Sequence, residues 1–210
     1  MRLFSAFFVV TLLFFSADCD SKVQNVTQVT ISSAKAKTVS DDFSTEDSSW
    51  KQWSGKWIFT RGVVQQSATA EYYPLILRQD KQYGDADISV DFKPISGRID
   101  ASGGLVFRAV DEKNFYIVRA NALEDNFRLY TFKNGYRRQI ASAKVSAPEL
   151  GKFHQIRVVV QGNHIQAYLD GTLYLDHYDS SFAQGYVGLW TKADSVTEFD
   201  NLQITGVAAE

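Results

Sequence analysis

The chain contains a series of short segments in which apolar and polar residues alternate, and residues 152–204 show this most clearly. Gly, Asn or Asp stands at nearly every break between the segments, as at Asp170-Gly171. A period of two is typical of a β-strand with one buried face, and an Asp-Gly pair suits a two-residue hairpin turn. The pattern therefore predicts antiparallel strands joined by tight turns.

The same alternation continues through the middle of the chain. In residues 85–94, apolar residues occupy one face of the expected strand, and Asp85, Asp87 and Asp91 occupy the other. We expect ~12–14 strands in total, which is more than one open sheet holds without curling. The predicted fold class is therefore all-β, with two antiparallel sheets packed face to face in a jelly-roll sandwich. A closed barrel is the alternative.

The N-terminal 19 residues have the features of an export signal. Arg2 precedes an apolar run at residues 3–15, and the small residues Ser16 and Ala17 follow it, with Asp18 directly before Cys19. The run of ~13 residues is shorter than the ~20 that a membrane-spanning helix needs. We therefore predict a cleaved signal peptide, a secreted or periplasmic protein, and a mature chain without a transmembrane helix. An uncleaved anchor is one alternative, and a lipid anchor through Cys19 is another.

The remaining chain divides into two parts by composition. Residues 20–40 are rich in Ser, Thr, Lys, Gln and Val and contain no Gly or Pro, which is typical of a flexible leader. Residues 41–207 form the expected β-sandwich domain. The formal net charge of −2 gives no general attraction to nucleic acid, so we expect no nucleic-acid partner, and we expect a monomer. Because Cys19 is the only cysteine, the mature domain has no disulfide or catalytic thiol.

Basic and aromatic residues form the strongest candidate site. In the strand around residues 185–190, Val187 and Leu189 are expected to face the core, so Trp190 and Lys192 share the opposite face. We expect a concave face that presents Trp190 and several guanidinium groups to solvent. Aromatic rings and bidentate donors suit sugars, whereas the alternative is cross-strand packing. The predicted ligand-binding residues are Arg108, Tyr116, Arg119, Asn121, Arg128, Tyr130, Trp190 and Lys192.

Carboxylates stand near both ends of the expected domain. If the first and last strands pair, Asp42 and Asp200 approach each other, and such oxygen ligands suit Ca²⁺. Ca²⁺ is therefore the one candidate cofactor, and turn capping is the alternative role of these residues. The face that carries Asp85, Asp87 and Asp91 suits an acid–base pair or a metal, but we favour a solvated outer face.

Two stretches of the chain resemble a known group of domains. Residues 104–136 and 185–202 resemble the middle and last strands of the concanavalin A-like lectin/glucanase superfamily. They are most similar to bacterial exported domains of the 3-keto-disaccharide hydrolase group and to laminin-G-like sandwiches. Gly55 before Trp57 and the turn at Asp170-Gly171 support the resemblance, which extends over residues 41–204.

The resemblance implies the sandwich fold but leaves the activity open, because one fold hosts unrelated functions. The glycosidase branch of the superfamily carries an ExDxxE motif, which this sequence lacks, so we do not expect ordinary retaining glucanase chemistry. We expect an exported carbohydrate-binding domain that contacts glycan through its concave face. One alternative is a hydrolase acting on a modified (3-keto) disaccharide. The other is a protein-binding adhesion or structural module.

Overall fold

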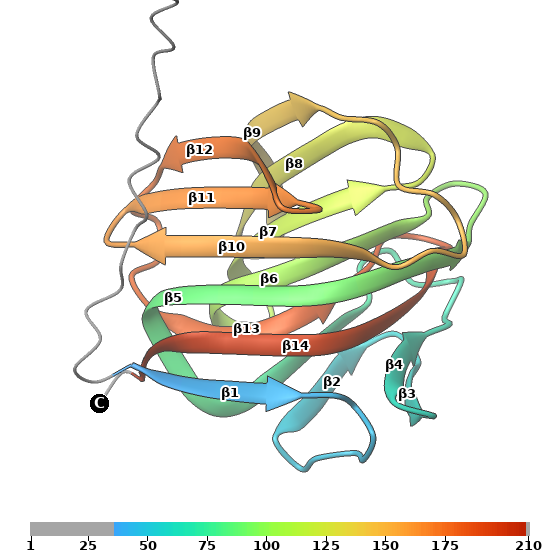
Figure 1. Ribbon diagram of the computed structural model, residues 1–210, viewed down its shortest axis with the longest axis horizontal. Coiled ribbons are helices and arrows are strands. Elements are labelled where there is room, and N and C mark those ends of the chain that lie inside the picture. The colour runs from blue at the N-terminus through green and yellow to red at the C-terminus, as the bar shows by residue number, and fades with distance from the viewer. Residues whose placement is uncertain (1–35, 209–210) are drawn as a thin grey trace, which may run out of the picture.

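A computed structural model describes residues 36–208, and these residues contain strands and no helix. The 14 strands are all antiparallel to their neighbours (Figure 1). They are β1 (Lys37–Asp41), β2 (Trp50–Ser54), β3 (Trp57–Thr60), β4 (Val63–Gln66), β5 (Leu75–Ser96), β6 (Ser102–Asp111), β7 (Asn114–Asn121), β8 (Glu124–Lys133), β9 (Tyr136–Lys144), β10 (His154–Gln161), β11 (His164–Leu169), β12 (Thr172–Tyr178), β13 (Gly185–Trp190) and β14 (Val196–Ala208).

The strands pack as two layers that share the long strand β5. Residues 75–78 of β5 pair with β2 and β13, and the sheet continues through β6, β7, β8 and β9; we call this layer sheet I. Residues 86–96 pair with β10 and β14 in the other layer, sheet II, which also contains β11, β12, β1, β4 and β3. Figure 1 shows β5 turning at one side of the molecule from the near layer to the far one. The predicted all-β sandwich is confirmed.

The main core lies between the two sheets and follows the alternation of the sequence. Ile88, Val90 and Phe92 of β5 point from sheet II toward Leu105 and Phe107 of β6 in sheet I. Their side chains have at most 1% of their surface exposed. Because burial of such side chains stabilises a fold by roughly 1.5–3 kcal/mol each, this core fixes which face of each strand points outward.

The first and last strands pair, as the sequence suggested. β1 is antiparallel to β14, with Asp41 opposite Leu202. Strand structure therefore begins at Lys37, inside the segment that composition describes as a leader ending at residue 40. The polar composition of β1 does not indicate a strand, because β1 is held mainly by backbone hydrogen bonds to the edge of β14. Residues 1–35, which include the predicted signal peptide and Cys19, lie outside the described residues.

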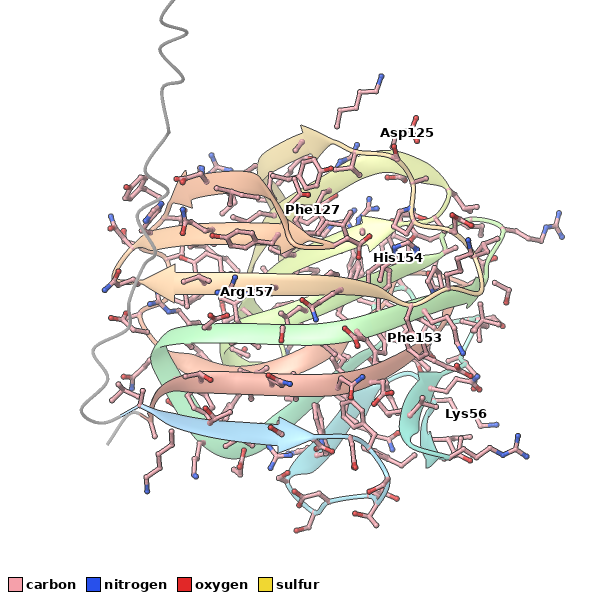
Figure 2. The ribbon with its side chains drawn as sticks, viewed as in Figure 1. Lys56, Asp125, Phe127, Phe153, His154 and Arg157 are labelled. Carbon is pink, nitrogen blue, oxygen red and sulfur yellow. The ribbon has the colours of Figure 1, made fainter. Side chains whose placement is uncertain are left out.

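The outer face of sheet II is polar, in agreement with the solvated face that we favoured. Arg157 lies on β10 (Figure 2) and forms a bidentate pair with Asp87 at 2.7 and 2.5 Å. Asp91 accepts hydrogen bonds from Gln155 and Asn201. These acids pair with neighbouring polar groups rather than with one another. No helix in residues 36–208 is long and apolar enough to cross a membrane.

Candidate functional site

The outer face of sheet I carries a second apolar cluster, although no other layer covers it. Leu75 and Leu77 of β5, Phe115 and Ile117 of β7, and Phe132 of β8 belong to it, together with Trp190 at its centre. A single sheet face that buries this much apolar surface is unusual for a solvent-exposed layer. We call this apolar cluster the floor of the outer face, because polar side chains lie on it.

Trp190 is on the expected face of β13, but the expectation that it is exposed to solvent is wrong. Its exposed surface is 0%. The ring of Tyr73 stacks on it at 5.6 Å between ring centres, and Phe132 contacts it edge-on. A Cβ atom at Gly104 would lie 3.2 Å from the Trp190 ring, so the indole lies across this glycine. Trp190 is therefore part of the floor and cannot stack on a ligand.

Polar side chains gather at one end of this floor. Arg119 of β7 is 1% exposed and donates to Glu124 at 2.8 Å, while Arg128 of β8 lies 3.6 Å from the same carboxylate. Both guanidinium groups reach the Tyr130 hydroxyl at 3.5 Å. Arg119 and Arg128 meet because they are directly opposite in the β7–β8 pairing. We call Arg119, Glu124, Arg128, Tyr130 and Arg137 the arginine cluster.

Arg137 of β9 joins the cluster to the aromatic floor. Its guanidinium carbon lies 4.6 Å from the Tyr130 ring centre and 5.3 Å from that of Tyr73. Cations held over aromatic rings in this way gain about 0.5–2 kcal/mol. Arg137 forms no ion pair with a carboxylate among residues 36–208, and its guanidinium instead contacts the two rings.

A buried ion pair borders the cluster. Lys192 donates to Asp100 at 2.9 Å, and Asp100 is fully buried. The turn that carries Asp100 is held by Asp194, whose carboxylate accepts backbone N–H groups of residues 98–100. Asn121 ends β7 beside this turn and accepts from the N–H groups of Ala101 and Leu123. Asn121 and Asp194 therefore position the loops that surround the cluster.

Buried polar atoms without a hydrogen-bond partner are concentrated at this end of sheet I. Such atoms are rare in proteins, and each costs about 1–3 kcal/mol unless water or a ligand pairs with it. This end of sheet I therefore has the most unmet hydrogen-bonding capacity among the described residues. At this end of sheet I they are Asp100 Oδ1, Arg119 Nε and Nη1, Asn121 Nδ2, Asn126 Oδ1, Arg128 Nε, Arg137 Nη1 and Trp190 Nε1, and elsewhere in residues 36–208 they are Ser49 Oγ and Tyr83 Oη.

The cluster is charged at neutral pH. Burial alone would raise the pKa of Glu124, but hydrogen bonds from Arg119 and Asn126 and the charges of Arg119 and Arg128 outweigh it and lower that pKa to about 2. Burial likewise disfavours the charged form of Arg119, yet Tyr130, Glu124 and Asp100 outweigh it and raise the pKa of Arg119. Glu124 is therefore a hydrogen-bond acceptor and not a proton donor.

These values predict how the cluster responds to acid. Because the pKa of Glu124 is lower in the folded state than the ordinary value of 4.5, its stabilising contribution is complete above that value and is lost as the pH falls toward about 2. We expect an NMR titration of the Glu124 carboxyl to have its midpoint near 2. Glu124→Gln should remove this part of the acid-induced loss of stability. A midpoint at the ordinary value for glutamate would contradict the described pairing.

Arg108 is not part of the cluster, so its predicted place on the outer face is wrong. Its backbone has a φ of 49°, and the pairing of β6 with β13 shifts register between Val106 and Ala109, where β6 has one extra residue. The shift turns Arg108 toward the end of the sandwich, where it donates to the carbonyls of Gly84, Gly162 and Phe182 at 2.8–3.1 Å. The alternation rule fails at this bulge because an extra residue changes the face.

Tyr116 is also misplaced in the prediction. It lies on the inner face of β7, stacks on Phe107 at 5.1 Å and donates to Asp179 at 2.5 Å. Burial and the Asp179 hydrogen bond raise the pKa of Tyr116 to about 12. Its position could have been predicted from the sequence, because Tyr116 has the opposite parity to Phe115 and Arg119.

A pocket of about 160 Å³ opens on the outer face of sheet I, toward the β8–β9 turn. The bulge in β2 places Trp53 at its rim, and the aromatic rings of Tyr73, Phe115 and Phe132 form its wall. Trp53 was part of a tryptophan-rich segment of the sequence but was not assigned to a site. Glu124 was likewise missed, although it shares the parity of Arg128 and Tyr130 in β8. Tyr73 and Arg137 were also missed, and no pattern within their own segments could have indicated them.

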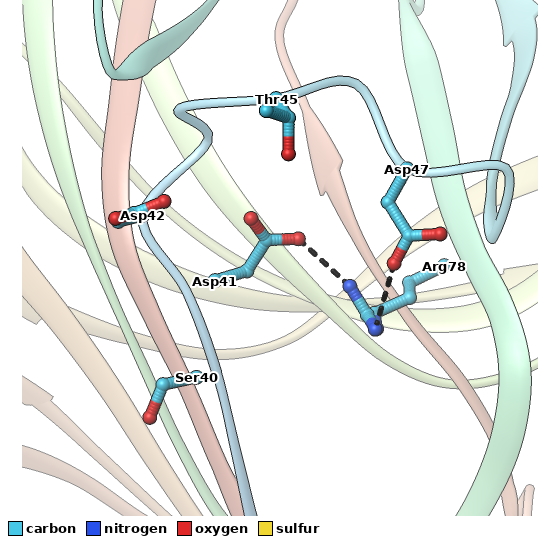
Figure 3. A pocket seen from close by; sticks show the side chains of 6 residues that line it. All are labelled: Ser40, Asp41, Asp42, Thr45, Asp47 and Arg78. Carbon is cyan, nitrogen blue, oxygen red and sulfur yellow. Dashed lines mark hydrogen bonds and ion pairs between the residues drawn. The ribbon is translucent and has the colours of Figure 1, made fainter.

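Asp42, one of the two predicted metal ligands, lines a different cavity of about 350 Å³ (Figure 3). Asp41 and Asp47 pair with Arg78 there at 2.7 and 3.2 Å. Asp200 lies opposite Asp91 in the pairing of β14 with β5, and burial, with the charges of Asp91 and Asp42, raises the pKa of Asp200. Within residues 36–208, no group of three or more His, Cys, Asp or Glu side chains is arranged to hold a metal ion. The calcium site stays a prediction.

Comparison with solved structures identifies similar folds. The chain is similar to the carbohydrate-binding module CBM66 from Bacillus subtilis, with a TM-score of 0.67, 26% identity, and coverage of 74% of this chain and 94% of that one. It is also similar in fold to the Bacillus licheniformis β-glucanase, with a TM-score of 0.57, 13% identity, and coverage of 80% and 97%. These neighbours confirm the concanavalin A-like jelly roll that the sequence resembled.

Sequence comparison adds a relative and a family. The chain is 28% identical over 181 residues to a levanase of Bacillus subtilis (strain 168), with coverage of 84% of this chain and 26% of the levanase. The chain thus spans about a quarter of the length of that relative. A family model described as "3-keto-alpha-glucoside-1,2-lyase-like domain" matches residues 36–205. Because this match includes every strand from β1 to most of β14, the chain belongs to the 3-keto-alpha-glucoside-1,2-lyase-like domain family.

Proposed function

We propose that this protein binds carbohydrate at the arginine cluster on the outer face of sheet I. The observation that carries the proposal is the concentration of buried, unpartnered polar atoms around Arg119, Arg128 and Arg137. A sugar offers hydroxyl groups that both donate and accept hydrogen bonds, so it can accept from the Arg128 guanidinium and donate to the Glu124 carboxylate together.

The cluster suits sugars in geometry as well as in charge. A guanidinium group is planar and donates along two parallel directions, which matches neighbouring hydroxyl groups of one ring. Glu124 stays ionised and accepts hydrogen bonds from other hydroxyls. Charge-assisted hydrogen bonds of this kind are roughly twice as strong as neutral ones. Arg128 and Glu124 have about a third of their side-chain surface exposed, so a ligand can reach them.

The relatives support the same proposal and suggest the first ligand to test. The CBM66 structure is named a carbohydrate-binding module, and the levanase is named for levan. We therefore take levan as the first probe. Export through residues 1–19, which we keep as a proposal, would bring the domain into contact with polysaccharides outside the cell.

An enzymatic function is the second candidate, because the family is named after a lyase. Acid–base catalysis needs a group whose pKa lies near the working pH. Glu124, the exposed acid of the cluster, has a pKa of about 2 and cannot donate a proton at neutral pH. This observation favours binding over cleavage. We expect no product from a 3-keto disaccharide incubated with the protein, and turnover that disappears in Glu124→Gln would favour the enzyme instead.

Arg128→Ala provides the direct test of binding. A hydrogen bond to a charged group contributes about 1.5–3 kcal/mol, so we expect retention on levan to weaken about tenfold or more. The matched control is Arg138→Ala, because Arg138 is an exposed arginine of β9 whose side chain borders a different pocket from the cluster. The measurement is affinity electrophoresis and calorimetry on levan, lichenan and cellulose, with melting temperatures for both variants. The proposal fails if wild type binds none of these polysaccharides, or if Arg128→Ala binds as wild type does.

A further inference from the structure

We infer that the aromatic pocket of Trp53, Tyr73, Phe115 and Phe132 is a second subsite, which holds the neighbouring sugar residue of a glycan chain bound at the arginine cluster. The inference rests on the proposed function, since it adds a position to the same site. It predicts that the protein recognises an oligosaccharide and not only one sugar ring.

The pocket has the chemistry of a subsite for a sugar ring. Its wall is aromatic, and its lining includes one carboxylate, Glu112, which forms a long ion pair with Lys113 at 4.0 Å. An aromatic ring packs against the C–H face of a sugar, while a carboxylate at the edge accepts hydrogen bonds from hydroxyl groups. A purely apolar ligand would leave the Glu112 carboxylate without a partner.

The local backbone directs Trp53 toward this pocket. The β2–β5 pairing shifts register between Gln52 and Ser54, so Trp53 is the extra residue of a β-bulge. Bulges re-aim a side chain that regular alternation would place elsewhere. Lys51 lies 4.0 Å from the Trp53 ring centre and orients the indole. Trp53 is 36% exposed, whereas Trp50, Trp57 and Trp190 are at most 8% exposed.

The pocket is continuous with the arginine cluster. Tyr73 lines the pocket and also contacts Arg137, which in turn contacts the Tyr130 ring. Tyr130 reaches Arg119 and Arg128 through its hydroxyl. One ligand can therefore extend from the guanidinium groups across Arg137 to the aromatic wall without leaving the outer face of sheet I.

The four tryptophans of the chain make this inference directly measurable. All four lie in the described residues, and Trp53 is the one that acrylamide can reach readily. We expect a tetrasaccharide from levan to protect the tryptophan fluorescence of wild type from acrylamide quenching. The levan monosaccharide should bind at the arginine cluster without protecting the tryptophan fluorescence from acrylamide. If the tetrasaccharide binds and Trp53 stays as quenchable as in the free protein, the subsite is wrong.

Affinity measurements on variants complete the test. Trp53→Ala should lower the affinity for the tetrasaccharide about five- to tenfold, in line with the contribution of an aromatic contact. The affinity for the monosaccharide should be unchanged. Trp53→Phe should restore most of the loss. Tyr178→Ala, which removes an exposed ring from β12 in sheet II, is the matched control.

The outcomes separate the subsite from the proposed function. Equal affinity of Trp53→Ala and wild type for the tetrasaccharide would overturn the subsite while leaving binding at the arginine cluster intact. If Trp53→Ala lost affinity equally for the monosaccharide and the tetrasaccharide, the subsite would also be overturned, because Trp53 would then contact the sugar bound at the arginine cluster. Absence of wild-type binding to either sugar would overturn both proposals.

Discussion

Trp190→Ala is expected to lower the free energy of unfolding by ~3–5 kcal/mol, the range for removing a large buried aromatic side chain. Trp190 is fully buried between Tyr73, Phe132 and the Gly104 backbone. Its loss would open a cavity in the outer floor of sheet I and remove the surface on which Tyr73 rests. The change should appear as a lower denaturation midpoint in urea, with little change in slope.

The comparison that isolates burial is Trp53→Ala, which removes the same side chain from a partly exposed position. We expect its cost in stability to be a small fraction of that of Trp190→Ala. If both variants unfolded at the same urea concentration as wild type, the packing described for Trp190 would be incorrect. Glycan retention of Trp190→Ala should be measured well below its unfolding transition, since it tests the floor and not a direct contact.

Arg108→Met is expected to cost about 2–4 kcal/mol, because it leaves up to three backbone carbonyls without their donor. Arg108 is 3% exposed and donates to Gly84, Gly162 and Phe182. These residues belong to β5, to the β10–β11 turn and to the loop before β13, so one side chain ties together three segments that are distant in the sequence. Burial lowers the pKa of Arg108, but the charge of Asp85 opposes this effect.

Thermal and urea unfolding of Arg108→Met and Arg138→Met measure this effect. The exposed Arg138 should change stability by no more than about 0.5 kcal/mol. At temperatures where Arg108→Met is folded, its affinity for levan should equal that of wild type, because Arg108 is not in the arginine cluster. If Arg108→Met were as stable as wild type but no longer bound levan, Arg108 would belong to the binding site.

Part of the site could be predicted from parity alone. Arg119, Arg128 and Tyr130 lie on the outer face of sheet I, as the alternation of β7 and β8 indicates. Parity is reliable there because both strands are regular over this stretch. Parity fails at Arg108 and Trp53, where β-bulges interrupt the alternation. No local sequence pattern indicated those bulges.

The burial of Trp190 could not be predicted in the same way. Its cover is Tyr73, which is more than a hundred positions earlier in the chain and reaches Trp190 only because β5 pairs with β13. Arg137 is a similar case, since its position between Tyr73 and Tyr130 depends on three strands meeting in sheet I. Exposure is a property of neighbours, and neighbours depend on strand order.

The sequence by itself determined the sandwich, its strands and the core face of most of them, because alternation and turn residues act over a few positions. The tertiary structure alone decided which side chains meet on the outer face of sheet I and which of them water or a ligand can reach. The physical reason is that strand pairing brings together residues that are far apart in the chain. Which side chains meet therefore depends on the order of the strands in the sheet.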